Sequence, residues 1–124
     1  RPLFAAEHTY RETLQAELRK NLKNHLPRIL WAGLYGSFVS NKIKSRSDLD
    51  LLALVKDNDR VSEIESKLQQ TAESIKKQYG FWLSPMVLTP TQLRKSQDLA
   101  DSIRRHNLPL LGGNLSRFLT GESP

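Results

Sequence analysis

Asp48 and Asp50 stand one residue apart at the start of an almost entirely apolar run that ends at Val55. If this run is a strand, its side chains alternate between two faces, so both carboxylates share one face about 6.6 Å apart. Two carboxylates at about 6 Å repel each other by ~3 kcal/mol at an effective dielectric constant of about 20, unless a cation lies between them. Mg²⁺ commonly takes one or two carboxylates together with substrate phosphates. We therefore predict that Asp48 and Asp50 bind Mg²⁺, although an Asp-x-Asp pair by itself is more often a strand-entry cap or a solvated edge.

Gly36 and Ser37 follow a shorter apolar run and have the residue types that suit phosphate binding. Glycine lets the backbone approach a phosphate closely, and a helix beginning at Ser37 would point free N–H groups at the anion. This phosphate site and the aspartate pair meet at one edge of a sheet only if the two strands run antiparallel. Lys42 and Lys44 lie in the connection, where they either contact a triphosphate or belong to an ordinary solvated loop.

Hydrophobic periodicity predicts the elements that must position these residues. Four-residue spacing of apolar side chains predicts a first long helix, and strand-length apolar runs predict the strands on either side of the second helix. Pro85 lies within the third strand, which indicates an edge position or a bulge. The predicted helices cover residues 5–25, 61–79, 98–105 and 115–119, with a helical turn from Thr89-Pro90, and the predicted strands cover 29–35, 49–55 and 81–88.

The fold class expected from this order is α/β, a small mixed β-sheet flanked by helices. The 124 residues have the size of one domain, and we expect residues 1–124 to form it. Arg1 stands where a start Met would, so we expect residues 1–4 to be the remnant of an upstream linker. There is no Cys, which excludes disulfides and thiolate metal sites and is compatible with a cytoplasmic location. The net charge of +6 favours anionic partners, and we expect no membrane partner because no apolar run approaches ~20 residues.

The stretches Gly36-Ser37 and Ser47-Asp48-Leu49-Asp50-Leu51 together resemble the signature of the nucleotidyltransferase superfamily that includes DNA polymerase beta. The resemblance is strongest to the minimal nucleotidyltransferases, and it implies the nucleotidyltransferase fold. It also implies that Gly36 and Ser37 bind the phosphates of ATP or another nucleoside triphosphate, and that Asp48 and Asp50 hold the catalytic Mg²⁺. Ser47, Lys42 and Lys44 are further candidate contacts to the nucleotide. The implied reaction transfers a nucleoside monophosphate to a hydroxyl of a protein or RNA acceptor. The implied partners include an upstream winged-helix DNA-binding domain or the other protein of a toxin–antitoxin pair.

Two departures from the family pattern bear on activity. Ser40 and Asn41 stand where the family often has Arg-Gly, and residues 81–88 contain no acid where the family has its third carboxylate. Ser84 is the nearest polar residue there, and loss of a general base typically costs ~10²- to 10⁴-fold in rate. The alternative function is therefore a nucleotide-binding or regulatory module whose chemistry is weakened or lost. A third class is direct nucleic-acid binding through the basic surface, with affinity that falls steeply with salt.

The histidine and tryptophan side chains are expected to have structural roles rather than roles in binding or catalysis. His8, His25 and His106 lack metal-ligand spacing and are expected at the surface or at helix ends. Trp31 and Trp82 are expected in the core or at an interface rather than as base-stacking platforms.

Overall fold

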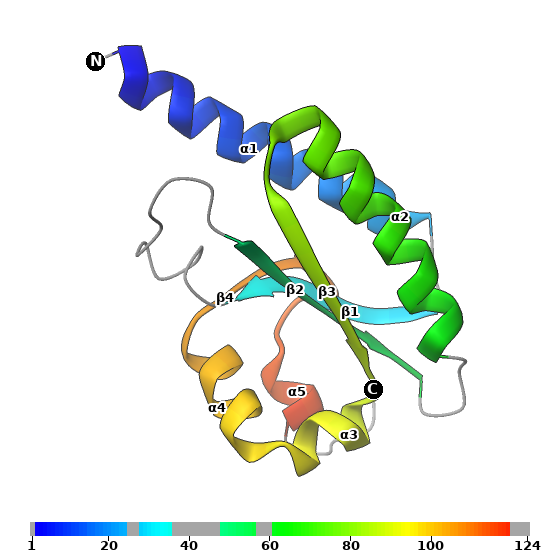
Figure 1. The fold of residues 1–124 in the computed structure, drawn as a ribbon. Helices are drawn as coiled ribbons and strands as arrows, with labels where there is room; N and C mark the ends of the chain where they lie inside the picture. Colours follow the sequence, from blue (N-terminus) through cyan, green and yellow to red (C-terminus); the bar gives the residue numbers. More distant parts are fainter. Residues whose placement is uncertain (1, 25–27, 36–47, 57–60, 120–124) are drawn as a thin grey trace.

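The computed structural model describes residues 2–24, 28–35, 48–56 and 61–119, with only the backbone for residues 2–11 and 48. Helices and strands alternate along much of the chain, as the predicted α/β class requires (Figure 1). None of the described helices is both long enough and apolar enough to cross a membrane. The elements in order are α1 (Pro2–Lys23), β1 (Ile29–Tyr35), β2 (Asp48–Val55), α2 (Val61–Tyr79), β3 (Trp82–Leu88), α3 (Pro90–Lys95), α4 (Gln97–Arg105), β4 (Asn107–Leu111) and α5 (Ser116–Leu119).

The described strands form one four-stranded sheet in the order β3-β2-β1-β4. β1 pairs antiparallel with β2 and with β4, whereas β2 pairs parallel with β3, so the sheet is mixed as predicted. The parallel pair needs a crossover connection, and α2 supplies it. The antiparallel pairing of β1 with β2 meets the condition for a shared phosphate and metal site.

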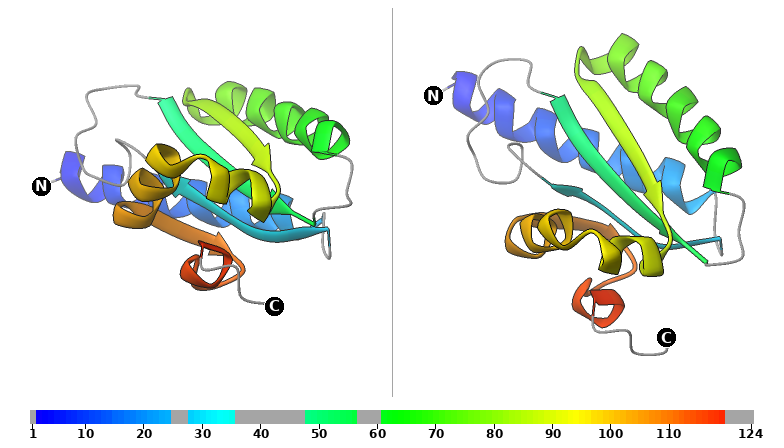
Figure 2. Two further views of the ribbon diagram at one scale, coloured as in Figure 1. Left: turned by 90° about the horizontal axis from the view of Figure 1, so that it is seen from below. Right: turned by 60° about the horizontal axis from the view of Figure 1, so that its bottom comes forward.

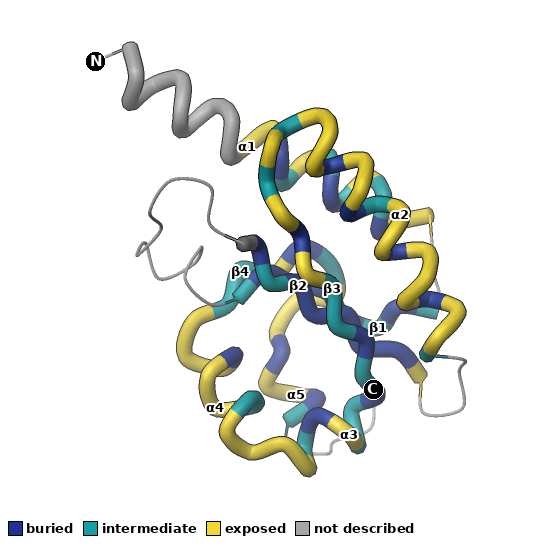
Figure 3. Tube along the Cα trace, in the orientation of Figure 1, coloured by how far each residue is buried: buried dark blue, intermediate teal, exposed yellow. Residues whose placement is uncertain are grey.

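Helices cover both faces of the sheet. Figures 1 and 2 show α1 and α2 on one face and α3, α4 and α5 on the other. Buried apolar side chains accordingly form two clusters, one between the sheet and α1 and α2 and one between the sheet and the C-terminal helices. Figure 3 shows β1 and the central strand β2 largely buried, and many exposed residues along the helices on both sides. β2 contributes to both clusters, which explains why its sequence is almost continuously apolar.

The predicted helix boundaries are largely confirmed. Leu14, Leu18 and Leu22 of α1 are fully or almost fully buried, which matches the apolar stripe in the sequence. This helix starts at Pro2 and ends at Lys23, earlier at both ends than the predicted 5–25. α2 spans Val61–Tyr79 as predicted, and Gly80 ends it with a φ of 78° and an N–H donated to the carbonyl of Lys76 at 2.9 Å.

Two further local predictions are confirmed around β3. Pro85 lies in an edge strand of the described sheet, the position that proline favours because it has no N–H to donate. Thr89 caps α3 through a reciprocal capping box with Gln92, and Pro90 occupies the first helical turn.

β4 is the element that the sequence analysis did not predict. Its five residues, Asn107–Leu111, contain Pro109 and show no clean alternation, so no local signal marks them as a strand. They become a strand by pairing with Ala32, Gly33, Leu34 and Tyr35 of β1. The predicted order of elements was therefore wrong at this point, because pairing with a distant strand decided the conformation of the segment.

Trp31 fixes the turn that follows β4. Its indole Nε1 donates a 2.9 Å hydrogen bond to the carbonyl of Gly113, and the ring is completely buried. A Cβ at Gly33 would lie 2.5 Å from this ring, so only glycine fits beneath it. Gly112 has a φ of 94° and packs so closely that a Cβ would lie 2.4 Å from the carbonyl oxygen of Leu30. The predicted Gly112-Gly113 turn is confirmed, and its packing against β1 orders the C-terminal layer.

Candidate active site at the Asp50 end of the sheet

The end of β1 and the start of β2 lie side by side. Tyr35 is the partner of Asp50 in the antiparallel register, and Gly36 follows Tyr35 directly in the chain. The pairing therefore brings the start of the Gly-Ser segment next to the start of the aspartate segment. Five predicted site residues lie outside the described residues: Gly36, Ser37, Lys42, Lys44 and Ser47.

Asp50 lies on the sheet face that carries the C-terminal helices. Leu49 and Leu51 are fully buried in the cluster with α1 and α2, as predicted for residues that anchor the aspartates. Strand alternation places Asp50 on the opposite face together with Leu52, which belongs to the cluster with α3, α4 and α5. Asp50 is half-buried, so its carboxylate lies on a rigid element while part of it stays accessible. Asp48 is the first residue of β2, and only its backbone is described.

A polar row crosses the whole sheet at this end. Ser84 of β3 is the register partner of Asp50, Asp50 is the partner of Tyr35, and Tyr35 is the partner of Asn107 of β4. Asn107 Nδ2 donates a 2.8 Å hydrogen bond to the carbonyl of Ile103, which connects the row to α4. The next row toward the other end, Met86, Leu52, Gly33 and Pro109, has no charged or hydroxyl-bearing side chain. Polar chemistry on this face is thus concentrated where the two predicted binding segments meet.

The electrostatics of the row favour a cation near Asp50. Burial raises the pKa of the Tyr35 hydroxyl above its ordinary value of 10.0, and the negative charge of Asp50 raises it further. The charge of Asp50 therefore places a negative potential on this row. A divalent cation would offset this potential.

The residue types present fit Mg²⁺ with shared ligation. Asp48 and Asp50 carry carboxylate oxygens, the hard donors that Mg²⁺ prefers. Within the described part of the chain, no group of three or more His, Cys, Asp or Glu could hold a metal ion. Magnesium ions in proteins commonly complete their coordination with water and with phosphate oxygens of a nucleotide.

Ser84 is the register partner of Asp50 on β3, the strand on which the family resemblance predicted a third carboxylate. Neighbouring strands lie about 4.8 Å apart, so the parallel register places the Ser84 backbone directly beside Asp50. Ser84 is exposed, and no residue of β3 is acidic. The departure noted in the sequence therefore falls on the residue nearest to Asp50 on that side, which leaves the site without a carboxylate base there.

Tyr35 and Asn107 are members of the row that sequence reasoning missed. Tyr35 was assigned only to an apolar strand, although its place immediately before Gly36 was a usable signal. Asn107 had no usable signal because the strand that contains it was not predicted.

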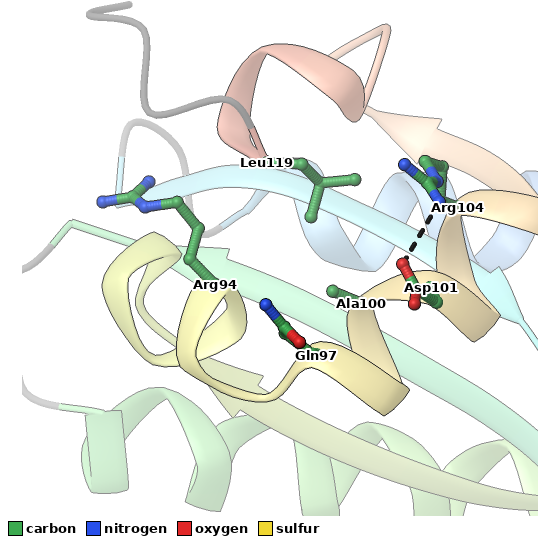
Figure 4. A pocket seen from close by; sticks show the side chains of 6 residues that line it. All are labelled: Arg94, Gln97, Ala100, Asp101, Arg104 and Leu119. Atoms are coloured by element: carbon green, nitrogen blue, oxygen red, sulfur yellow. Dashed lines mark hydrogen bonds and ion pairs between the residues drawn. The ribbon is translucent and has the colours of Figure 1, made fainter.

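A separate cavity of about 290 Å³ lies among α3, α4 and α5 and contains none of the predicted site residues. Figure 4 shows its charged side chains, two of which form an ion pair between Arg104 and Asp101 at 3.1 Å. Arg94 Nη1 donates to the carbonyl of Phe118 at 3.0 Å and so connects α3 to α5. The ion pair lies within α4, whereas the Arg94 hydrogen bond joins two helices of the C-terminal layer. Its lining residues are Arg94, Gln97, Ala100, Asp101, Arg104 and Leu119.

Comparison with solved structures shows the same fold in toxin–antitoxin complexes. One similar chain belongs to the crystal structure of a toxin–antitoxin with AMP-PNP, with 17% identity, a TM-score of 0.64, and coverage of 86% of this chain and 82% of that chain. Another belongs to the toxin–antitoxin MntA–HepT, with 16% identity, a TM-score of 0.59, and coverage of 89% and 81%. A third belongs to a tri-AMPylated Shewanella oneidensis HEPN toxin in complex with MNT antitoxin, with 13% identity, a TM-score of 0.56, and coverage of 89% and 81%. At these identities the likeness shows the fold alone.

Comparison by sequence points the same way. No curated protein matches the chain. The family described as polymerase beta, nucleotidyltransferase, matches residues 16–106, which is more than half of the chain and includes β1, β2 and β3. The signature residues Gly36, Ser37, Asp48 and Asp50 all fall within the matched segment. The chain therefore belongs to the polymerase beta nucleotidyltransferase family.

Proposed function

We propose that this protein transfers AMP from ATP to a hydroxyl group of a partner protein in a Mg²⁺-dependent reaction. The observation that carries the proposal is the register pair of Asp50 with Tyr35, which brings the aspartate segment next to the start of the Gly36-Ser37 segment in a member of the nucleotidyltransferase family.

In the proposed reaction, the acceptor oxygen forms a bond to the α-phosphorus of ATP. The bond from that phosphorus to the bridging oxygen breaks, pyrophosphate leaves, and the hydroxyl proton passes to solvent or a base. Asp48 and Asp50 would hold Mg²⁺, which when bound neutralises phosphate charge and orients the leaving group. Gly36 and Ser37 would bind the phosphates, with Ser47, Lys42 and Lys44 as further contacts to the nucleotide. Tyr35 and Asn107 keep the end of β1 in register with β4, so the phosphate-binding segment leaves the sheet beside Asp50.

Two relatives of the same fold support the choice of nucleotide and acceptor. One was crystallised with AMP-PNP, an ATP analogue, and another contains a tri-AMPylated HEPN toxin in complex with MNT antitoxin. AMP on a protein acceptor therefore ranks ahead of other nucleotides and of RNA. A second protein of a toxin–antitoxin pair is the natural candidate for the acceptor.

Ser84 favours a second candidate function. Because β3 offers no carboxylate beside Asp50, the protein would bind Mg²⁺ and ATP without efficient transfer and act as a nucleotide-binding regulatory module. The two candidates share the binding step and differ in turnover.

Calorimetric titration tests whether the protein binds a nucleotide and whether binding needs Mg²⁺ and the two aspartates. ATP and GTP are titrated into the wild type with and without Mg²⁺, and then into the Asp48→Asn/Asp50→Asn double variant. Glu65→Gln, an exposed carboxylate on α2 and so on the opposite side of the sheet, serves as the matched control for loss of charge. We expect Mg²⁺-dependent ATP binding that is at least ~100-fold weaker in the double variant and unchanged in the control. Equal affinity in the wild type and the double variant would overturn both candidate functions.

Radiolabelled ATP separates transfer from binding alone. With the label on the α-phosphate, we expect incorporation into a protein of a host-cell extract, because AMP retains that phosphorus. With the label on the γ-phosphate, we expect none, because pyrophosphate carries it away. Binding without incorporation from the α-labelled ATP would favour the regulatory module.

A further inference from the structure

Trp82 is the exposed large apolar side chain among the described residues. Its relative exposure is 54%, whereas the other tryptophan, Trp31, is completely buried. The ammonium nitrogen of Lys76 lies 3.4 Å from the centroid of the Trp82 ring, a cation–π contact that holds the ring at the surface. An exposed aromatic ring on a rigid strand is typical of a recognition residue rather than of a core residue.

Trp82 also lies next to the candidate active site. It is the first residue of β3 and the register partner of Asp48 in β2. Adjacent strands are about 4.8 Å apart, so the Trp82 backbone lies one strand spacing from that of Asp48, while its ring packs against Lys76 of α2. This side of the site faces away from β1, which leads to the phosphate-binding segment.

A groove extends from Trp82 between β3 and α2. Its volume is about 550 Å³, which is enough for several side chains of a bound segment. Ala72 and Leu83 are almost fully buried and form its apolar floor. Lys76, Lys77 and Glu73 line its rim. We name this surface the α2–β3 groove.

The rim of the α2–β3 groove has an excess of positive charge. Two lysines stand against one glutamate, and neither lysine forms an ion pair with another described residue. The whole chain is also basic, with a net charge of +6. Acidic ligands are therefore complementary to the groove and are steered toward it.

Strand addition is an unfavourable way to fill the groove. Pro85 lies in the middle of the edge strand β3 and has no N–H to donate to an added strand. A bound segment would instead be held by its side chains, on Trp82 and on the lysines.

We propose that the α2–β3 groove docks an acidic segment of the acceptor protein, with an aromatic or apolar side chain against Trp82 and carboxylates at Lys76 and Lys77. The groove lies on the α2 face of the sheet and Asp50 on the other face, so the bound segment would pass the free edge at Trp82 to bring its hydroxyl to the aspartates. The transfer step rests on the proposed function, whereas the docking step does not. Single-stranded RNA is the competing occupant, since bases also stack on tryptophan and phosphates would also meet the two lysines.

The docking step is tested with the random copolymer poly(Glu,Tyr), which carries acidic, aromatic and hydroxyl groups together. Binding of the fluorescently labelled copolymer to the full chain is followed by anisotropy, with poly(Lys,Tyr) as the basic counterpart. We expect poly(Glu,Tyr) to bind and poly(Lys,Tyr) to bind at least about tenfold more weakly. Equal binding of the two copolymers, or displacement of poly(Glu,Tyr) by oligouridine at lower concentration than by unlabelled copolymer, would overturn the proposal.

Variants localise the binding. Trp82→Ala and Lys76→Glu/Lys77→Glu should each weaken poly(Glu,Tyr) binding about tenfold or more, while Trp82→Phe retains most of it. Lys20→Glu/Lys23→Glu on α1 makes the same charge change on exposed residues outside the groove and should have a smaller effect. If Trp82→Ala binds as tightly as the wild type, the groove is not the docking site. Circular dichroism and urea unfolding of each variant establish that it is folded.

AMP transfer to poly(Glu,Tyr) separates this proposal from the proposed function. Groove-dependent binding without incorporation from α-labelled ATP would support docking and count against transfer. Incorporation that is equal in the wild type and Trp82→Ala would support transfer and overturn the groove.

Discussion

The two faces of the sheet are built from the same strands but differ in role: one only packs the core, and the other also carries the candidate active site. On the face under α1 and α2, β2 presents Leu49, Leu51, Ala53 and Val55, all fully buried. On the other face, Leu52 and Leu54 are equally buried, but Asp50 replaces a further apolar residue at one end. One face is therefore apolar along the whole of β2, and the other is apolar only up to the polar row. A single-residue alternation lets one strand anchor itself in the core and present a charged group at the same time.

The largest expected effect is on stability, at the all-apolar face. Leu51→Ala removes a fully buried side chain and should lower the free energy of unfolding by ~2–5 kcal/mol. Asp50→Ala, its neighbour on the other face, should lower it by less than about 1 kcal/mol because it is half-buried and faces other polar groups. Urea unfolding measures both. Similar losses of unfolding free energy in the two variants would mean that the Asp50 face contributes as much to stability as the all-apolar face.

Ser84→Asp should add the third carboxylate that the candidate active site lacks. A carboxylate at this position lies beside Asp50 in the register and supplies the missing base, so the rate of AMP transfer should rise by ~10²-fold. The added negative charge should also make the variant less stable than the wild type when a chelator removes Mg²⁺. Adding Mg²⁺ should restore the stability of the variant. Thermal unfolding with and without Mg²⁺ detects this second effect independently of activity. Ser84→Asn keeps the size without the charge, and a matching response from that variant would refute the role of charge.

Gly33→Ala should disturb the C-terminal layer. The added Cβ would lie 2.5 Å from the Trp31 ring, which holds the turn at Gly113 through its indole hydrogen bond. Such overpacking typically costs ~1–3 kcal/mol. Urea unfolding gives the loss, and hydrogen exchange should show it as faster exchange in β4 and α5. Gly80→Ala is the contrasting variant, since a Cβ there has nothing within 4 Å and only its φ of 78° opposes it. Undisturbed exchange in β4 and α5 would show that Trp31 accommodates the methyl group.

The smallest effect concerns the ionisation of Tyr35. Because burial and the charge of Asp50 raise its pKa, Asp50→Asn should lower that pKa toward the ordinary value while leaving the contribution of burial. A folded-state pKa above the unfolded one stabilises the protein below the unfolded pKa, about 10, and this stabilisation is lost as pH rises through the folded pKa.

Ultraviolet absorbance titration of the phenolate follows this change, with Tyr35→Phe to identify the component and Tyr79→Phe as the control tyrosine. In Tyr35→Phe the fall of stability above about pH 10 should be shallower than in the wild type. An unchanged Tyr35 titration in Asp50→Asn would show that the polar row is not electrostatically coupled.

Much of the architecture follows from local sequence because its causes are local. Apolar spacing places Leu14, Leu18 and Leu22 on one stripe of α1, and the positive φ at Gly80 ends α2 where the pattern predicts. Thr89 and Gln92 form their capping box within a single turn. The motif spacing likewise identifies the family, because Gly36, Ser37, Asp48 and Asp50 are read in order along the chain.

Tertiary structure decided whatever depends on residues far apart in the chain. Asn107–Leu111 became a strand only by pairing with β1, and that pairing completed the polar row through Tyr35 and Asp50. Trp31 and Trp82 are the same residue type in strands of similar length, yet one is buried under the C-terminal turn and the other is exposed at an edge. Periodicity gives the face of a side chain within its own element, whereas burial and register depend on which other elements pack against it.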